Sequence, residues 1–237
     1  MSWISRLFGR DEKQVAAPTL PGRRDFAELP RADFAEFTPD LGAFLGQAAY
    51  VQLEIFEGLA RAVLAAPSVV DKELLTEASA RALRKQQALV DVIRDAGLDP
   101  ADVMTPFAPA IDSFKAATTG SDWWELLVSS YVTGGILEEF FTGLAAGLPA
   151  PYAEQVSAIL AEPGASDDLA QIVGAGIAAD PDLQHRLALW ARRLVGDTLL
   201  VARSALRGEK DIDHVEPVFT ELIAGHSRRL DALGLTA

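Results

Sequence analysis

Two adjacent acidic residues, Glu138 and Glu139, interrupt the apolar stretch GGILEEFF, in a segment that otherwise has the composition of a buried helix. A buried carboxylate is costly unless it is paired, hydrogen-bonded, protonated or bound to a metal ion. Adjacent residues of a helix diverge by about 100° around its axis, so the two acids cannot both face one site. The pattern predicts that one of them faces the core, but periodicity does not choose between them, because the segment is apolar on nearly every side.

Polar residues also fall on the apolar stripes of three other segments. Asp197 and Gln86 each occupy a position, three or four residues from apolar neighbours, where a core residue is expected. Glu54 and Glu57 lie among apolar residues and are separated by about 60° around a helix, so either of them could face the core. Polar groups from several helices are therefore expected to point inward.

A metal site in the core of a bundle would explain these inward acids together. Di-iron and di-manganese bundles take a Glu from each of two helices and a Glu-x-x-His pair from each of the other two. Carboxylate and imidazole suit iron or manganese, and open coordination positions allow oxygen activation. The chain contains no Glu-x-x-His. The candidate ligands are Glu54, Glu57, Gln86, Glu138, Glu139, Asp197 and His226.

A core without metal explains the same residues. Glu57 precedes Arg61 by four residues, and Arg193 precedes Asp197 by four, so each acid has a potential ion-pair partner on its own helix. A buried polar network with water is an alternative for three residues: Glu54, Gln86 and Asp197. His226 lies on the apolar stripe of the last helix, where a hydrogen-bonded core histidine is more common than a ligand.

Helical periodicity predicts the elements that would position these residues. Long helices are expected over four segments, 41–66, 72–97, 121–147 and 181–208, and shorter ones near 151–162, 167–178 and 217–233. No segment shows the alternation of a strand. Two helical hairpins joined by a long crossover, 98–121, are typical of one bundle class. The predicted fold is an all-α, ferritin-like four-helix bundle with a long crossover and extra short helices.

The predicted bundle domain covers residues 41–237 and follows an irregular, proline-containing lead-in over residues 1–40. Trp3, Ile4, Leu7 and Phe8 make the start of the lead-in amphipathic. We expect this short segment to dock on its own domain or on a second subunit rather than on a membrane. Four aromatic residues make a homodimer plausible: Trp3, Phe8, Trp123 and Trp124.

Composition and charge limit the classes of function. The chain has 237 residues, a formal charge of −13 and no cysteine. The charge repels phosphate backbones at long range, and the missing thiols exclude disulfides and cysteine chemistry. Neither a secretory signal nor an apolar run of about eighteen residues is found, so a cytoplasmic protein without a membrane span is expected. Basic residues also occur in several groups, but such groups usually just form the solvated faces of helices. To bind RNA, several of them would have to converge on one surface.

A family resemblance rests on the stretches AYVQLEIFEGLARAV, SDWWELLVSSYV with EEFF, LALWARRLVGDTLLVARSAL and HSRRLDALGL. Together they resemble the actinobacterial MiaE-like branch of the ferritin-like superfamily over most of residues 41–235. The resemblance implies a non-haem di-iron enzyme that hydroxylates the isopentenyl group of a modified adenosine in tRNA. By position, Glu57, Glu139 and Asp197 correspond to its acids of the first, third and fourth helices. The resemblance thus makes these three the main candidate ligands, and Glu54, Glu138, Gln86 and His226 the secondary ones. Gln86 and Gln87 stand where a Glu and a His are expected.

Two hypotheses follow. One is an oxygen-dependent di-iron hydroxylase acting on tRNA, which the resemblance implies but the net charge does not support. The other is a non-catalytic, metal-free ferritin-like bundle that binds a small molecule or a protein, or serves a structural role, with polar core residues that fix the register of the helices. The missing Glu-x-x-His pairs favour the second hypothesis, and the resemblance favours the first.

Overall fold

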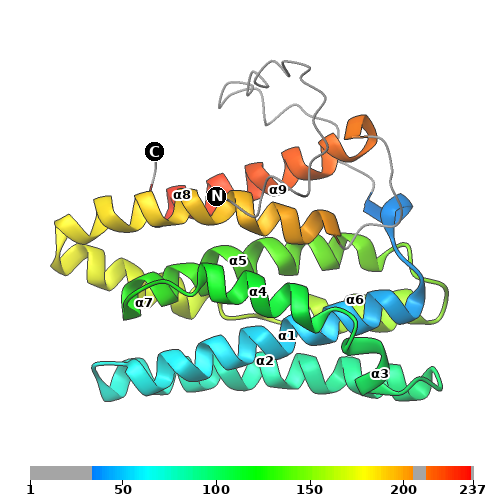
Figure 1. Ribbon diagram of the computed structural model, residues 1–237. Coiled ribbons are helices and arrows are strands. Elements are labelled where there is room, and N and C mark those ends of the chain that lie inside the picture. The colour runs from blue at the N-terminus through cyan, green and yellow to red at the C-terminus, as the bar shows by residue number, and fades with distance from the viewer. Residues whose placement is uncertain (1–33, 205–211, 236–237) are drawn as a thin grey trace, which may run out of the picture. The chain divides into compact units, whose positions relative to one another are not determined.

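The regular structure consists of helices throughout the part of the chain that the computed structural model describes, residues 34–204 and 212–235 (Figure 1). No strand occurs within these ranges. The all-α prediction is therefore confirmed. The amphipathic segment with Trp3 and Phe8 and most of the predicted lead-in lie outside the described residues. A short 3-10 turn, η3 (Phe34–Phe37), precedes the first long helix, and the ring of Phe34 packs edge-on against Phe140.

The first hairpin pairs α1 (Leu41–Ala65) with α2 (Val69–Asp95), and the two helices share the most extensive interface in the described structure. Asp40 caps α1 by accepting a hydrogen bond from the Ala43 N–H at 3.0 Å. Ser68 caps α2 in the same way through the Asp71 N–H, also at 3.0 Å. The cap at Ser68 starts α2 three residues before the predicted residue 72.

The crossover between the hairpins is itself largely helical, because two of its prolines stand in the first turn of a helix, where a missing N–H costs nothing, and Pro106 lies in the turn between the two short helices. Pro100 begins α3 (Pro100–Met104), and Pro109 lies in the first turn of α4 (Ala108–Thr118). α3 packs on α1, whereas α4 contacts both α1 and α8. In Figure 1, α4 runs along α1 and α5. The crossover thus places a helix over the junction of the two hairpins.

The second half of the bundle is built around α5 (Trp123–Ala145), which contacts α1, α8 and several shorter helices. Those shorter helices are α6 (Tyr152–Ala161) and α7 (Ser166–Ala179). The next long helix is α8 (Pro181–Ser204). Most residues of α5 are buried, which agrees with its nearly continuous apolar sequence. α5 is therefore the central helix of this half of the bundle.

The final helix, α9 (Ile212–Ala232), packs on α5 and α8 and begins five residues before the expected start at Pro217. The sequence pattern took Pro217 as a first helical residue, but it lies inside the helix. Residues Arg31–Ala237 form one compact unit around a shared apolar core. None of the described helices combines the length and apolar character that crossing a membrane requires.

Candidate functional site

The two acids of GGILEEFF leave α5 in different directions and meet different cations. Glu138 pairs with Lys85 of α2, and Glu139 pairs with Arg229 of α9. The side chains of both acids are partly buried, with exposed fractions of 20% for Glu138 and 30% for Glu139. The divergence of adjacent helical residues was predicted, but the structure gives each acid its own partner instead of leaving one in solvent.

Lys85 is the polar residue that α2 buries most deeply. Its side chain is 2% exposed, and its Nζ lies 2.9 Å from Glu138 Oε1 and 3.3 Å from the Leu160 carbonyl oxygen. A methyl group on Gly164 would come within 2.6 Å of Glu138 Oε2, so the carboxylate packs directly against this glycine. Gln86, predicted to point inward, is only partly buried. The core-facing stripe of α2 thus includes Lys85, one position earlier than expected.

The second pair, Glu139 and Arg229, joins α5 to α9. Arg229 Nη1 lies 2.7 Å from Glu139 Oε2, while its backbone carbonyl accepts a hydrogen bond from the Tyr131 hydroxyl at 3.1 Å. A methyl group on Gly225 would come within 2.7 Å of Glu139 Oε1, so this carboxylate also packs against a glycine. Glu139 is therefore committed to an interface with α9.

His226 is 4% exposed, as expected from its place on an apolar stripe. Burial, and then the charge of the nearby Arg229, lower the pKa of His226 to about 4. Its Nδ1 is buried without a hydrogen-bond partner within the described residues. His226 is therefore a neutral core residue at pH 7, and its packing on α9 places it near the Arg229 charge.

On α1, the structure reverses the expected order of the two acids. Glu57, a main candidate, has a side chain 48% exposed, whereas that of Glu54 is 12% exposed. Both acids pair with Lys115 of α4, which lies 2.9 Å from Glu57 Oε2. Glu57 also pairs with Arg61 at 4.0 Å, as predicted. The exposed fractions differ because the two acids are about 60° apart around α1, which places Glu54 under α4 and Glu57 at the solvent-facing edge.

A tyrosine adds a second polar contact between α1 and α4. The Tyr50 hydroxyl donates a hydrogen bond to Asp112 Oδ1 at 2.7 Å. Burial, and then this hydrogen bond, raise the pKa of Tyr50 above its ordinary value. Tyr50 therefore stays protonated and acts as a permanent donor to α4.

Asp197 is partly buried on α8, and its predicted partner Arg193 lies over the Trp190 ring, 5.4 Å from the ring centroid. No ion pair to Asp197 is found among the described residues. The most deeply buried polar residue nearby is Thr198, whose exposed fraction is 0%. The inward stripe of α8 is thus rotated by one residue from the predicted one.

The candidate ligands do not fit a di-iron centre as the structure places them. Glu54 and Glu57 face α4, Glu138 faces α2 and Glu139 faces α9, and each is paired with a lysine or an arginine. Among the side chains that the structure describes, those of residues 34–203 and 216–235, no three of the His, Asp or Glu type gather closely enough to hold a metal ion. The positive charges that a metal would supply come from basic side chains.

The same pairs use basic residues that could have formed an RNA-binding surface. Arg81 pairs with Asp168 of α7, and Lys85 and Arg229 pair with Glu138 and Glu139. The sequence has three groups of basic residues: Arg81 with Arg84 and Lys85, Arg192 with Arg193, and Arg228 with Arg229. Two of these groups thus lose members to interfaces inside the bundle.

A chemically distinctive space lies beneath α4, between α1 and α5, in two adjoining hollows. One has a volume of about 220 Å³ and is lined mainly by apolar residues, together with Gln47. The other has a volume of about 70 Å³ and extends toward Arg61 and Thr119. Val51, Ile111 and Leu137 line both hollows, so the two spaces meet at these side chains.

The hydroxyl groups that line the smaller hollow present acceptors. Each of four hydroxyls donates its hydrogen to a carbonyl four residues earlier on its own helix: Thr118, Thr119, Ser130 and Thr133. Their remaining lone pairs are free to accept. Ser129 Oγ accepts a hydrogen bond from Trp190 Nε1 at 2.8 Å. The polar part of the wall therefore suits a hydrogen-bond donor.

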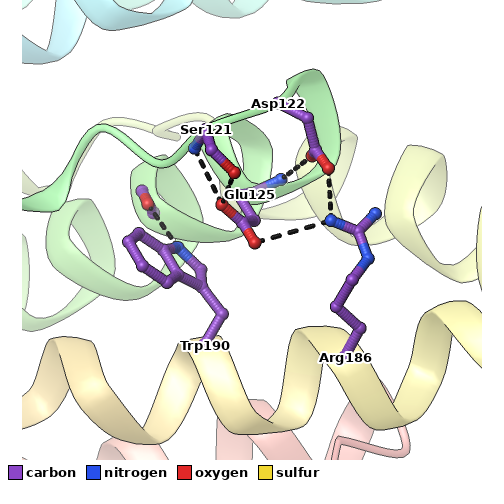
Figure 2. A network of polar contacts seen from close by, with 6 residues as sticks. Ser121, Asp122, Glu125, Arg186 and Trp190 are labelled. Atoms are coloured by element: carbon purple, nitrogen blue, oxygen red, sulfur yellow. Dashed lines mark hydrogen bonds and ion pairs between the residues drawn. The ribbon is translucent and has the colours of Figure 1, made fainter.

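A further polar network fixes α5 against α8 next to this wall (Figure 2). Asp122 caps α5 by accepting from the Glu125 N–H at 2.9 Å, and Glu125 accepts from the Ser121 N–H and hydroxyl. Arg186 of α8 pairs with both Asp122 and Glu125. Burial would raise the pKa of Asp122, but the hydrogen bonds from Glu125 and Arg186 lower it. This network positions Ser129 and Trp190.

Sequence reasoning did not identify Lys85 or Lys115 as inward residues, nor the space beneath α4. Lysines are normally solvated, and a lysine enters the core only when a carboxylate meets it there. A usable signal was present: Lys85 has the same spacing to Leu75, Ala78, Ala82 and Leu89 as a core residue.

Comparison with known proteins agrees with the fold. The family model described as "Ferritin-like domain, actinomycetes" matches residues 32–212. No curated protein matches the sequence.

Proposed function

Because the chain belongs to the actinomycete family of ferritin-like domains, we propose that it is a non-catalytic bundle that binds a small apolar molecule beneath α4. The observation that carries the proposal is the pair of adjoining hollows between α1, α4 and α5. Small-molecule sites are typically mostly apolar clefts with a few placed polar groups. The hollows have this character, because apolar walls surround Gln47, Glu54 and a row of hydroxyls.

The use of the carboxylates in ion pairs supports binding rather than oxygen chemistry. A di-metal site needs ionised acids that converge, whereas these acids neutralise Lys85, Lys115 and Arg229 at separate interfaces. The acids thereby stabilise the positions of α2, α4 and α9 around α5. The fold supplies a rigid frame, and the crossover helix closes the space within it.

Binding of benzene, detected through methyl resonances, tests the proposal. Dry apolar cavities take up such molecules saturably. We expect saturable shifts of the Val51, Ile111 and Leu137 methyl signals, together with a raised melting temperature. Ile111→Phe should abolish the shifts. Leu64→Phe should leave them unchanged, because Leu64 is 82% exposed and lies outside the hollows. Shifts that grow linearly without saturation, or that persist in the Ile111 variant, would contradict the proposal.

The di-iron tRNA hydroxylase remains the competing proposal, and it rests on the resemblance and on the ferritin-like fold. Metal analysis after aerobic purification with added iron separates the two functions. Two irons per chain, lost on Glu139→Ala or Asp197→Ala, would support the hydroxylase. We expect less than about a tenth of an iron per chain, because ion-paired carboxylates must give up a cation before they can bind a metal. If iron binds, hydroxylation of tRNA that carries the isopentenyl group is the next measurement.

A further inference from the structure

The two hollows beneath α4 follow one face of α1. Gln47, Val51, Ile55 and Gly58, spaced by three or four residues, line them in turn. From Gln47 to Gly58 the helix rises about 16 Å, at about 1.5 Å per residue. The combined space is therefore long relative to its volume. A linear molecule fits this shape better than a compact ring system.

The polar end of the space lies at the smaller hollow, beside Glu54. Lys115 Nζ gives its hydrogen bond to Glu57 Oε2 at 2.9 Å and is an ion-pair partner of Glu54. Glu54 Oε2 is buried and faces the Lys115 ammonium as its ion-pair partner. A carboxylate oxygen has two lone pairs, so this pairing leaves it able to accept a further hydrogen bond. Glu54 and the remaining lone pairs of Ser130 and Thr133 thus form a set of acceptors that can still take a donor.

The local charges are already balanced. Glu54 and Glu57 are offset by Lys115 and Arg61. A charged head group would upset this balance, and a carboxylate would bring no hydrogen to the acceptors. An uncharged group with an O–H satisfies them at no electrostatic cost.

We infer that the ligand is a straight-chain amphiphile with an uncharged, hydrogen-bond-donating head, such as a primary alcohol, whose head lies at Glu54 and whose chain runs past Val51 toward Gln47. This inference rests on the proposed function and adds the chemical class of the ligand. The apolar chain passes between Val51, Ile111 and Leu137, the three residues that line both hollows.

Calorimetric titration with three probes of equal chain length tests the head group: dodecanol, dodecanoate and dodecyltrimethylammonium. Dodecanol is expected to bind once per chain and about tenfold more tightly than the other two, which corresponds to one satisfied hydrogen bond. Glu54→Met should remove this preference. Glu57→Met is the matched control, because Glu57 pairs with the same lysine but does not line the space.

Chain length tests the path. In the wild type, dodecanol should bind more tightly than hexanol. Val51→Phe fills the junction of the hollows and should cut the affinity for dodecanol about tenfold while changing that for hexanol less than about twofold. Ile111→Phe is the second variant if Val51→Phe lowers the melting temperature too far for titration.

The outcomes separate the two claims. Absence of stoichiometric binding by any of the probes would overturn the proposed function together with this inference. Binding that Val51→Phe weakens, but without preference for the alcohol and without effect of Glu54→Met, would overturn the inference and leave the proposed function standing. Loss of the alcohol preference in Glu54→Met alone, with Glu57→Met unchanged, would support both.

Discussion

Lys85 Nζ lies 2.9 Å from Glu138 Oε1, and the lysine side chain is 2% exposed while that of the glutamate is 20% exposed. The pair joins α2 to α5, and the Leu160 carbonyl of α6 accepts a second hydrogen bond from the same lysine at 3.3 Å. A cation from one helix thus neutralises an acid that could have served a metal. The unequal burial of the partners has a measurable consequence.

Glu138→Gln should destabilise the protein more than Lys85→Met does. The first change leaves a buried ammonium without its counter-charge, which typically costs about 3 to 5 kcal/mol. The second leaves a carboxylate that still reaches water, and it gains an apolar chain in the core. Chemical denaturation of the two variants and of the double variant measures this order. Equal losses of unfolding free energy in the two single variants would contradict this order. So would losses that simply add in the double variant.

A matched control for this cycle is the surface pair Arg94 and Asp91, which lie 2.9 Å apart with side chains 63% and 70% exposed. Breaking that pair should change the free energy of unfolding by less than about 1 kcal/mol. The contrast separates burial from charge as the origin of the effect.

The stability of the protein should fall as the pH drops below about 6.5, because His226 resists protonation in the folded state. Its folded pKa is about 4 against an ordinary value of 6.5. Between these values the unfolded chain binds a proton that the folded chain does not. The stabilisation is therefore complete above pH 6.5 and is lost progressively toward pH 4, by roughly 3 kcal/mol in all.

The pH dependence is best measured between pH 6.5 and 5, before most carboxylates titrate. Denaturant unfolding should show a slope of about 1 kcal/mol per pH unit near the middle of the window. His226→Met should flatten the slope, whereas His185→Gln, a change at an exposed histidine, should retain it. If the slope persists in His226→Met, the pH dependence of stability arises from another titrating side chain.

The helices could be predicted from the sequence because their signals are local. Ser68 and Asp122 are side-chain caps, and both residues are of the types that favour the start of a helix. Apolar periodicity and proline positions then gave the order of the elements and the all-α class. The start of α9 was placed too late because Pro217 is a good first residue of a helix, and only packing decides that the helix begins before it.

The candidate site could be predicted only in part, because rotation around a helix axis is set by neighbouring elements. Gln86 and Lys85 differ by one position, and both fit the broad apolar stripe of α2. Glu54 and Glu57 differ by 60°, and the path of α4 decided which one is covered. Neither path nor rotation is encoded in the spacing of one segment. The metal and tRNA predictions derived from the resemblance therefore await their own experiments.

The cap of α5 should be worth more than that of α2, although both accept an N–H three residues on. Asp122 also pairs with Arg186, whereas Ser68 has no basic partner within the described residues. Ser68→Ala should cost about 1 kcal/mol and Asp122→Ala up to about 1 kcal/mol more, since the pair is half-exposed. Thermal unfolding at pH 7 measures the difference. Equal costs would mean that Arg186 contributes nothing.

The cover of the proposed binding space, α4, should open when its polar contacts to α1 are removed. Tyr50→Phe deletes the hydrogen bond to Asp112, and Lys115→Met leaves Glu54 buried and unpaired. The first change should cost about 1 kcal/mol and the second about 2 to 3 kcal/mol. The Tyr50 and Lys115 contacts both fix α4 and no other part of the crossover. Hydrogen exchange should therefore accelerate at the amides of residues 108–118 while those of α2 remain protected. Uniform acceleration across the bundle would show instead that α4 unfolds only with the whole domain.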